Sequence, residues 1–222
     1  DDESRAAHYL YGHIAGDAEY SVGHWLRDVA PFLSGGERPI IVGGTGLYFT
    51  ALTAGLADIP PTPAHIRQEA DDCAAQKGFE VMLAELDPET KARIDQRNPM
   101  RVQRAWEVLR TTGKPLAQWQ DETPPPLLDL SHCAPIIFDV EKDWLNARIA
   151  RRFDLMLEQG ALLEAEANLT DWSPNHLSAK AIGAPELMAH LQGHLSLEDA
   201  KERATIATRQ FAKRQRTWFR SK

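Results

Sequence analysis

The sequence predicts an α/β fold: a core built on parallel strands and interrupted by an all-helical insertion. Residues 39–42 form an apolar, β-branched run without alternation, which is typical of a strand buried on both faces. Residues 134–140 repeat this pattern further along the chain. Proline-rich segments at residues 60–63 and 124–126 bracket a stretch with helical periodicity only, as expected of an insertion between domain boundaries.

The boundaries of the elements follow from the spacing of apolar residues and from capping residues. We assign residues 1–57 and 133–222 to the core and residues 58–132 to the insertion. Gly160 marks the end of one core helix, and Ser196, followed by two acids in the first turn, marks the start of the last. The predicted helices cover residues 21–33, 47–56, 63–76, 79–86, 89–94, 99–109, 143–159, 162–169, 186–191 and 196–218.

Length and composition narrow the functional class. At 222 residues, with 43% hydrophobic and 26% charged residues, the chain is long enough for one domain with an appendage. No apolar run approaches the roughly 18 residues of a membrane helix, and the acidic residues 1–3 do not open a signal peptide. Cys73, Cys133 and the eight histidines form no metal-binding pattern. We therefore expect a cytoplasmic protein with reduced thiols and no metal ligands.

The charge of the chain is unevenly distributed. The net charge is −7, but residues 201–222 hold eight basic residues, the last of them Lys222, against one acid. This tail is therefore +7 and the preceding residues together are −14. Arg209, Lys213 and Arg216 fall on one face of the predicted helix, which favours a nucleic-acid backbone as partner. The alternative is a solvated helix that only balances the acidic body.

The most specific local feature is the turn after the first predicted strand. Gly43, Gly44, Thr45 and Gly46 join this strand to a helix, where backbone N–H groups converge with the positive end of the helix dipole. This arrangement favours phosphate binding, with the Thr45 hydroxyl at the same point. The alternative is that the glycines only allow tight packing. The turn is neither a Walker A loop nor the Gly-x-Gly-x-x-Gly fingerprint.

A pair of arginines indicates a second anion contact. Arg148 and Arg152 lie four residues apart on a predicted helix, where like charges cost about 0.3 kcal/mol unless an anion lies between them. Two guanidinium groups suit a pyrophosphate, which accepts bidentate hydrogen bonds. The alternative is that Asp154 and Glu158 neutralise both arginines as surface pairs.

Further basic residues lie in the insertion. Arg67 is on its first predicted helix, and Arg101 and Arg104 are on a later one. Alone they are typical of a solvated surface, but together with the basic tail they could line a nucleic-acid cleft. Phe211 and Trp218 on the tail helix favour core packing over base stacking.

Three motifs together resemble one protein family. Residues 43–48 are Gly-Gly-Thr-Gly-Leu-Tyr, residues 98–108 are Asn-Pro-Met-Arg-Val-Gln-Arg-Ala-Trp-Glu-Val with Thr-Gly-Lys at 112–114, and residues 209–220 are Arg-Gln-Phe-Ala-Lys-Arg-Gln-Arg-Thr-Trp-Phe-Arg. Their order and separation resemble the tRNA dimethylallyltransferases, or IPP transferases, from about Tyr20 to the end of the chain. The resemblance implies a P-loop NTPase-like parallel-sheet core, of the kind that binds ATP, with a helical insertion that grips the anticodon stem-loop.

The resemblance also implies an activity. The family transfers a dimethylallyl group from dimethylallyl diphosphate to N6 of adenosine 37 in tRNA, with Mg²⁺ bound through the diphosphate. We expect a cytoplasmic monomer with no membrane partner. Thr45 and Arg152 would be catalytic, and the diphosphate would be bound by Gly43, Gly44, Thr45, Gly46, Arg148 and Arg152. The tRNA would be bound by Arg67, Met100, Arg101, Val102, Gln103, Arg104, Lys180, Ala181, Ile182, Gly183, Arg209, Lys213 and Arg216.

The sequence departs from the family at its start. The Gly-Pro-Thr-x-Ser-Gly-Lys-Ser/Thr P-loop and the Asp-Ser-x-x-x-Tyr segment that supplies the general base are absent, and residues 1–3 do not match the acidic motif. We therefore expect the front of the core sheet to be missing and these residues to be inactive on their own. Ala184 and Pro185 also stand where the family more often has Gly-Tyr-Arg/Lys.

Two alternatives remain open. The chain could be an RNA-binding fragment without chemistry, which the absent P-loop favours and the presence of Thr45 and Arg152 opposes. It could also be an adenylate isopentenyltransferase, which prenylates a free nucleotide. The insertion and the basic tail oppose this, because a small acceptor needs neither. A nucleotide kinase is least favoured, since no Walker lysine is present.

Overall fold

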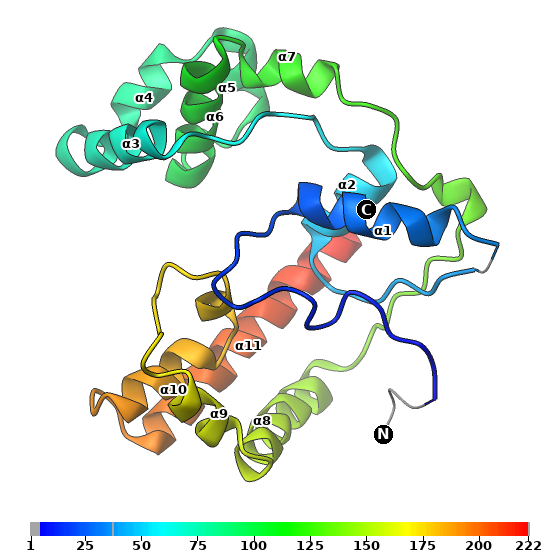
Figure 1. Cartoon of the computed structure of the whole chain (residues 1–222), viewed down its shortest axis with the longest axis vertical. Helices are drawn as coiled ribbons and strands as arrows, with labels where there is room; N and C mark the ends of the chain where they lie inside the picture. The colour runs from blue at the N-terminus through cyan, green and yellow to red at the C-terminus, as the bar shows by residue number, and fades with distance from the viewer. Residues whose placement is uncertain (1–4, 37, 222) are drawn as a thin grey trace. The chain divides into compact units, whose positions relative to one another are not determined.

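The computed structural model describes residues 5–36 and 38–221. Residues 1–3 and Lys222, which entered the sequence analysis, lie outside the described residues. The chain divides into two compact units, residues 50–129 and residues 1–49 with 130–222 (Figure 1). Each unit has a hydrophobic core of its own.

The unit of residues 50–129 is a cluster of short helices. Its core is centred on Met82, Val102 and Trp106, each at most 2% exposed. The Trp106 Nε1–H donates to Glu85 Oε2 at 2.7 Å, so the one polar group of the buried indole is satisfied. After the end of α2 (Gly46–Ala54), the helices of this unit are α3 (Ala64–Lys77), α4 (Phe79–Glu85), α5 (Pro88–Arg93), α6 (Pro99–Thr112) and α7 (Leu116–Asp121).

Helix α6 is capped at both ends by its own sequence. The Asn98 side chain accepts the N–H of Arg101 at 3.3 Å, and Pro99 occupies the first helical position, where its missing N–H costs nothing. Gly113 ends the helix at φ 69°, in the left-handed region that glycine adopts without strain. These caps fix where α6 begins and ends.

The other unit joins both ends of the chain. Its core contains Phe153, Leu187 and Met188, packed with Ala165 and Ala204. An ion pair of 2.7 Å between Lys201 Nζ and Asp154 Oδ1 also ties α11 to α8. The elements are α1 (Val22–Leu33), η2 (Leu130–His132), α8 (Lys142–Glu158), α9 (Ala161–Ala167), η3 (Ser178–Lys180), α10 (Ala184–Leu191) and α11 (Leu197–Arg220), together with the start of α2.

The two predicted strands are wrong for this structure, because the described residues contain no β-strand. Residues 39–42 and 134–140 have no regular secondary structure, and Ile40 and Phe138 are each 89% exposed. A parallel strand forms only where neighbours pair with its N–H and C=O groups and helices cover both faces. The apolar pattern depends only on the residues of the segment itself, so it does not reveal whether neighbouring strands are present.

The predicted helices are confirmed, with shifts of a few residues at several ends. Helix α6 extends three residues further than predicted, to the glycine that caps it. Helix α7, of only six residues, was not predicted. None of the helices in the described ranges is long and apolar enough to cross a membrane. Cys73 and Cys133 form no disulfide.

Candidate functional site

The predicted phosphate-binding turn comprises residues 43–46 and is here called the glycine turn. It leads directly into α2, whose first residue is Gly46. The Thr45 side chain is exposed, and the Thr45 carbonyl accepts the Tyr48 N–H at 3.0 Å to close the first turn. The first N–H groups of a helix have no partner within it. The turn therefore presents a hydroxyl beside a helix N-terminus.

The glycines of this turn also allow close packing. A Cβ on Gly46 would lie 2.5 Å from Cδ2 and 2.6 Å from Nε1 of Trp218, and a Cβ on Gly44 would collide with the Gln215 amide. Trp218 itself packs against Phe49, with ring centroids 6.4 Å apart. The packing explanation raised by the sequence thus holds for Gly44 and Gly46, and it is compatible with anion binding at Thr45.

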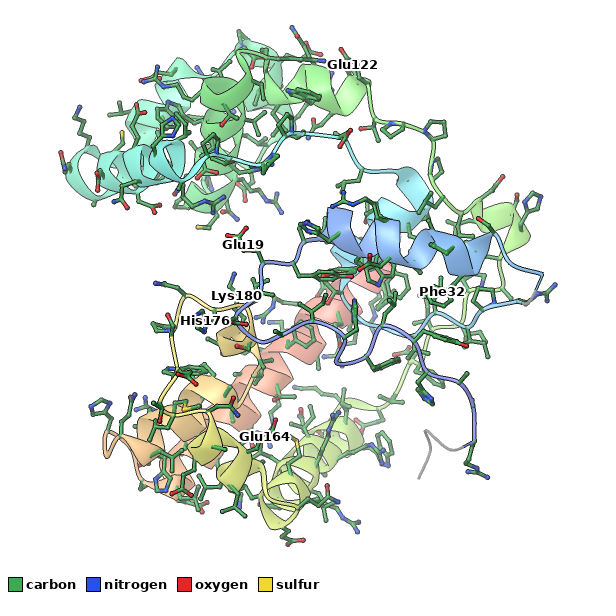
Figure 2. The ribbon with its side chains drawn as sticks, in the orientation of Figure 1. Glu19, Phe32, Glu122, Glu164, His176 and Lys180 are labelled. Carbon is green, nitrogen blue, oxygen red and sulfur yellow. The ribbon has the colours of Figure 1, made fainter. Side chains whose placement is uncertain are left out.

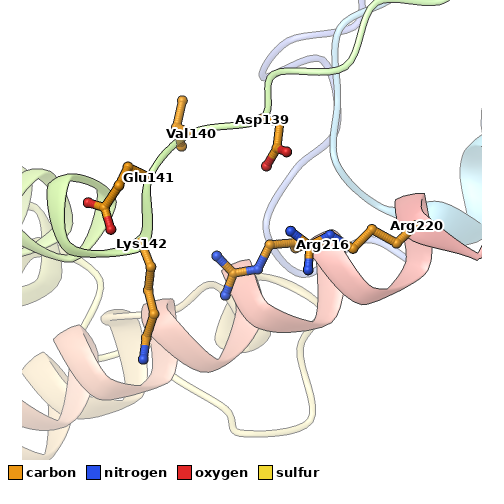
Figure 3. Close-up of a pocket in the computed structure, with 6 residues that line it drawn as sticks. All are labelled: Asp139, Val140, Glu141, Lys142, Arg216 and Arg220. Carbon is orange, nitrogen blue, oxygen red and sulfur yellow. The ribbon is translucent and has the colours of Figure 1, made fainter.

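The end of α11 that touches the glycine turn is basic. Arg216 and Arg220 line an open pocket of about 520 Å³ together with Lys142, Asp139, Val140 and Glu141 (Figure 3). Figure 3 shows the Asp139 carboxylate directed toward α11 from the irregular segment that precedes α8. Arg209 and Lys213, earlier on α11, are exposed. The predicted basic stripe therefore lies mostly at the surface.

Helix α8 carries the two arginines predicted to bind diphosphate. Both Arg148 and Arg152 are exposed, and the Arg148 guanidinium lies 5.5 Å from the centroid of the Trp144 ring. In the described part of the chain neither arginine forms a salt bridge, and Asp154 instead pairs with Lys201. The alternative in which Asp154 and Glu158 neutralise these arginines is therefore not what the structure shows.

The predicted tRNA contact at residues 180–183 packs against α8. Gly183 is buried at φ 102°, and a Cβ there would lie 3.0 Å from Cε2 of Phe153, which follows Arg152 on α8. Lys180 is the exposed last residue of η3, between α9 and α10 and close to His176 (Figure 2). Ala181 and Ile182 are also exposed. Glycine is required here by the backbone angle and by the close approach of the ring.

The glycine turn and the middle of α8 contact α11 at different positions along its axis. The turn meets α11 at Gln215 and Trp218, whereas α8 meets it at Lys201 through Asp154. At 1.5 Å per residue these two contacts are about 21 Å apart along the helix axis. The segments that carry Thr45 and Arg152 thus contact the same helix at separate points along its axis.

The predicted RNA-binding residues of the other unit lie on α3 and α6. Met100 is 73% exposed and Arg101 is also exposed, whereas Val102 is fully buried beside Trp106. The Val102 side chain therefore belongs to the core. The arginines predicted from the sequence, Arg67 and Arg104, meet at one carboxylate, that of Glu107.

Two groups of polar residues were not found by the sequence analysis. Glu107 is one, although its position three residues after Arg104 on a helix is a signal that could have indicated it. The other contains His13, Tyr20 and Asp28, where the Tyr20 hydroxyl donates to Asp28 Oδ2 at 2.7 Å. Burial, followed by the bond to Asp28, raises the Tyr20 pKa, and the same bond lowers the Asp28 pKa. No local pattern joins these three residues.

The described residues contain no group of three or more His, Cys, Asp or Glu side chains that could hold a metal ion. A Mg²⁺ ion held mainly by the diphosphate, as the resemblance implies, would not need such a group.

Comparison with known proteins decides the family. The family described as IPP transferase matches residues 1–222. A tRNA dimethylallyltransferase of Ruegeria sp. (strain TM1040) is 62% identical over 222 residues, which is the whole of this chain and 76% of that protein. The chain belongs to the IPP transferase family. A second tRNA dimethylallyltransferase, from Dinoroseobacter shibae, is also 62% identical and is covered over 75% of its length.

Solved structures of isopentenylpyrophosphate transferases support the same family assignment. The chain is similar to the full-length tRNA isopentenylpyrophosphate transferase of Bacillus halodurans, with 31% identity and a TM-score of 0.62, covering 97% of this chain and 69% of that one. It is similar to the corresponding transferase of Staphylococcus epidermidis with 28% identity and a TM-score of 0.59, covering 96% of this chain and 71% of that one.

Proposed function

We propose that the function is the transfer of a dimethylallyl group from dimethylallyl diphosphate to N6 of adenosine 37 in tRNA, for which residues 1–222 supply substrate-binding surfaces. The single observation that supports this most is the 62% identity to tRNA dimethylallyltransferases over the whole length of this chain. The tRNA substrate of a bacterial enzyme is cytoplasmic, and we propose that the protein acts there as a monomer.

The residue roles follow from the charges that the reaction creates. Cleavage of the allylic C–O bond leaves negative charge on the departing diphosphate. In the complete enzyme, Thr45, the adjacent helix N-terminus and Arg152 would bind that charge together, and donors of this kind are usually the largest catalytic contribution. This requires the segments that meet α11 about 21 Å apart in residues 1–222 to approach each other. Arg148 and Arg152, which lack carboxylate partners among the described residues, are available to an anion. Gly43, Gly44 and Gly46 would let the backbone approach it.

The adenine amine needs precise placement, because its lone pair is delocalised into the ring and it is a poor nucleophile. A base must also accept its proton. The family's Asp-Ser-x-x-x-Tyr segment, which would supply that base, is absent from this sequence. We therefore propose that residues 1–222 bind both substrates but do not turn them over.

Each unit would contribute its own residues to tRNA binding. On one unit these are Arg67, Met100, Arg101, Gln103 and Arg104, with Val102 supporting them from the core. On the other they are Lys180, Ala181, Ile182 and Gly183 with Arg209, Lys213 and Arg216. We propose that residues 58–132 form the insertion domain and that residues 39–42 and 134–140 become strands of a P-loop-type sheet when neighbouring strands are present.

The test uses residues 1–222 and a chimera that adds the P-loop and general-base segment of the Ruegeria relative. Each is incubated with an A36-A37 anticodon stem-loop, dimethylallyl diphosphate and Mg²⁺, and the RNA is analysed by mass spectrometry. The chimera should add five carbons to A37, and residues 1–222 alone should bind the stem-loop without modifying it. A chimera that binds RNA but never modifies it would instead favour an RNA-binding module.

Substitutions in the chimera test the assigned roles. Thr45→Ala and Arg152→Gln should each lower turnover by about 10²- to 10³-fold, because each removes a donor to the leaving group. Arg151→Gln is the matched control: the residue is the exposed neighbour of Arg152 on α8 and points to a different face of the helix. Equal losses in Arg151→Gln and Arg152→Gln would contradict the assignment.

A further inference from the structure

A buried carboxylate lies beneath the two predicted RNA-binding arginines of the helical unit. The Glu107 side chain is only 4% exposed. Its Oε2 lies 3.6 Å from Nη2 of Arg67 on α3 and 4.0 Å from Nη1 of Arg104 on α6. The two guanidinium groups remain open to solvent, with their side chains 59% and 43% exposed. One carboxylate thus links two surface cations from different helices.

Two neutral side chains complete this arrangement. Thr62 Oγ1 accepts from Arg104 Nη1 at 2.7 Å and donates to Glu107 Oε2 at 3.5 Å. The Gln103 amide nitrogen donates to Glu107 Oε1 at 3.1 Å and to Asp71 Oδ1 at 2.7 Å. Both oxygens of Glu107 therefore have partners, so the carboxylate is fixed in position.

The stability of the unit does not explain why a charge is buried here. A buried carboxylate loses its hydration, and a well-packed apolar residue of similar size would serve a core at least as well. Helices α3 and α6 are also joined by an exposed pair, Arg110 Nη2 and Glu69 Oε1, at 2.9 Å. Burial together with the nearby Arg67 charge lowers the pKa of Arg104, while Glu107 opposes both effects. Glu107 instead holds the guanidinium groups of Arg67 and Arg104 near each other, where their mutual repulsion would otherwise drive them apart.

We propose that Glu107 is a positioning residue that holds Arg67 and Arg104 side by side to bind adjacent phosphates of a folded RNA. This inference rests on the proposed function, because it requires that the two arginines bind the anticodon stem-loop. Two guanidinium groups held at a fixed separation select a backbone with matching phosphate spacing. Freely moving arginines would bind any RNA about equally well. Glu107 would therefore contribute to selectivity more than to affinity for RNA in general.

The experiment compares binding of two RNAs of equal length, the anticodon stem-loop and an unstructured sequence, to residues 1–222. Glu107→Gln keeps the shape of the side chain and removes its charge. The dissociation constant for the stem-loop should rise by about 5- to 20-fold, and that for unstructured RNA should stay within about 2-fold, since non-specific binding depends on the number of cations. Glu69→Gln, which breaks the exposed pair on the same two helices, should change neither constant.

A double-mutant background separates positioning from a general structural role. In Arg67→Gln/Arg104→Gln, adding Glu107→Gln should change stem-loop affinity by less than about 2-fold, because the arginines through which Glu107 acts are gone. A full additional loss there, or no loss of selectivity in Glu107→Gln alone, would overturn the proposal. If Glu107→Gln does not fold, Thr62→Val, which removes the hydroxyl that Arg104 contacts, should show a smaller loss of the same selectivity. A wild-type chain that binds both RNAs equally would instead refute the proposed function.

Discussion

Substituting Gly46 by alanine tests whether α11 packs on the glycine turn. A Cβ at this position would lie 2.5 Å from Cδ2 of Trp218, whereas ordinary contacts are 3.4–4 Å. The indole would therefore have to move by about 1 Å in a region that is otherwise closely packed. It is not free to do so easily, because it contacts Phe49 and Phe219, with ring centroids 6.4 and 4.9 Å away.

The expected magnitude follows from two opposing contributions. Overpacking of this kind costs about 1–3 kcal/mol. Alanine is favoured over glycine within a helix by about 0.5–1 kcal/mol, and Gly46 is the first residue of α2. The free energy of unfolding should therefore fall by about 1–2 kcal/mol in Gly46→Ala. Urea denaturation followed by tryptophan fluorescence measures it, and Trp218 is itself a reporter at the site.

A matched control lies three residues away. A Cβ on Gly43 would meet Phe49 Cζ at 3.8 Å, an ordinary contact, so Gly43→Ala should change stability by less than about 0.5 kcal/mol. In a Trp218→Leu background, Gly46→Ala should cost less than in the wild type. If Gly46→Ala were as stable as Gly43→Ala, the contact between α11 and the glycine turn would be refuted.

Three further predictions concern the helical unit. Met82→Ala should lower the free energy of unfolding by about 2–5 kcal/mol, because the side chain is fully buried, and Met100→Ala, at a position 73% exposed, should change it by less than about 0.5 kcal/mol in the same denaturation experiment. Gly113→Ala should cost about 1 kcal/mol through strain alone, since its φ is 69° and no atom lies within 4 Å of the added Cβ; equal thermal midpoints for wild type and variant would contradict this. The hydrogen bond from Arg93 holds the pKa of Asp121 below its ordinary 3.8, so the contribution of this pair to stability is complete above that pH and is lost as the pH falls through the lower folded-state pKa. Asp121→Asn should therefore lose less stability on acidification than the wild type, as measured by thermal midpoints between neutral and acidic pH.

Local sequence was sufficient to predict the α-helices other than α7. The boundaries of α6 depend only on nearby residues, because it is capped by Asn98, Pro99 and Gly113 of the same segment. The predicted strands failed for the opposite reason, because a strand at residues 134–140 needs neighbours that no local pattern reveals. The domain division at residues 58 and 132 stays a prediction.

The residues of the candidate site divide in the same way, into those indicated by a short motif and those whose role depends on contacts between distant parts of the sequence. Thr45 and Arg152 were predicted because each belongs to a short pattern with a chemical meaning, and their roles stay predictions. Glu107 was missed because its role depends on Arg67, forty residues earlier in the chain and on another helix. The contact of Gly46 with Trp218 likewise joins segments that only the fold brings together.

The exposed apolar segments have a practical consequence for handling the protein. Ile136, Ile137 and Phe138 are 79%, 58% and 89% exposed, and Ile40 is 89% exposed, with no β-ladder formed by either segment. Exposed apolar stretches whose backbone groups form no ladder are templates for intermolecular β-pairing. At the concentrations needed for crystallisation or NMR, residues 1–222 should therefore self-associate through these stretches. A lysine placed at Ile136 would act as a gatekeeper against that aggregation.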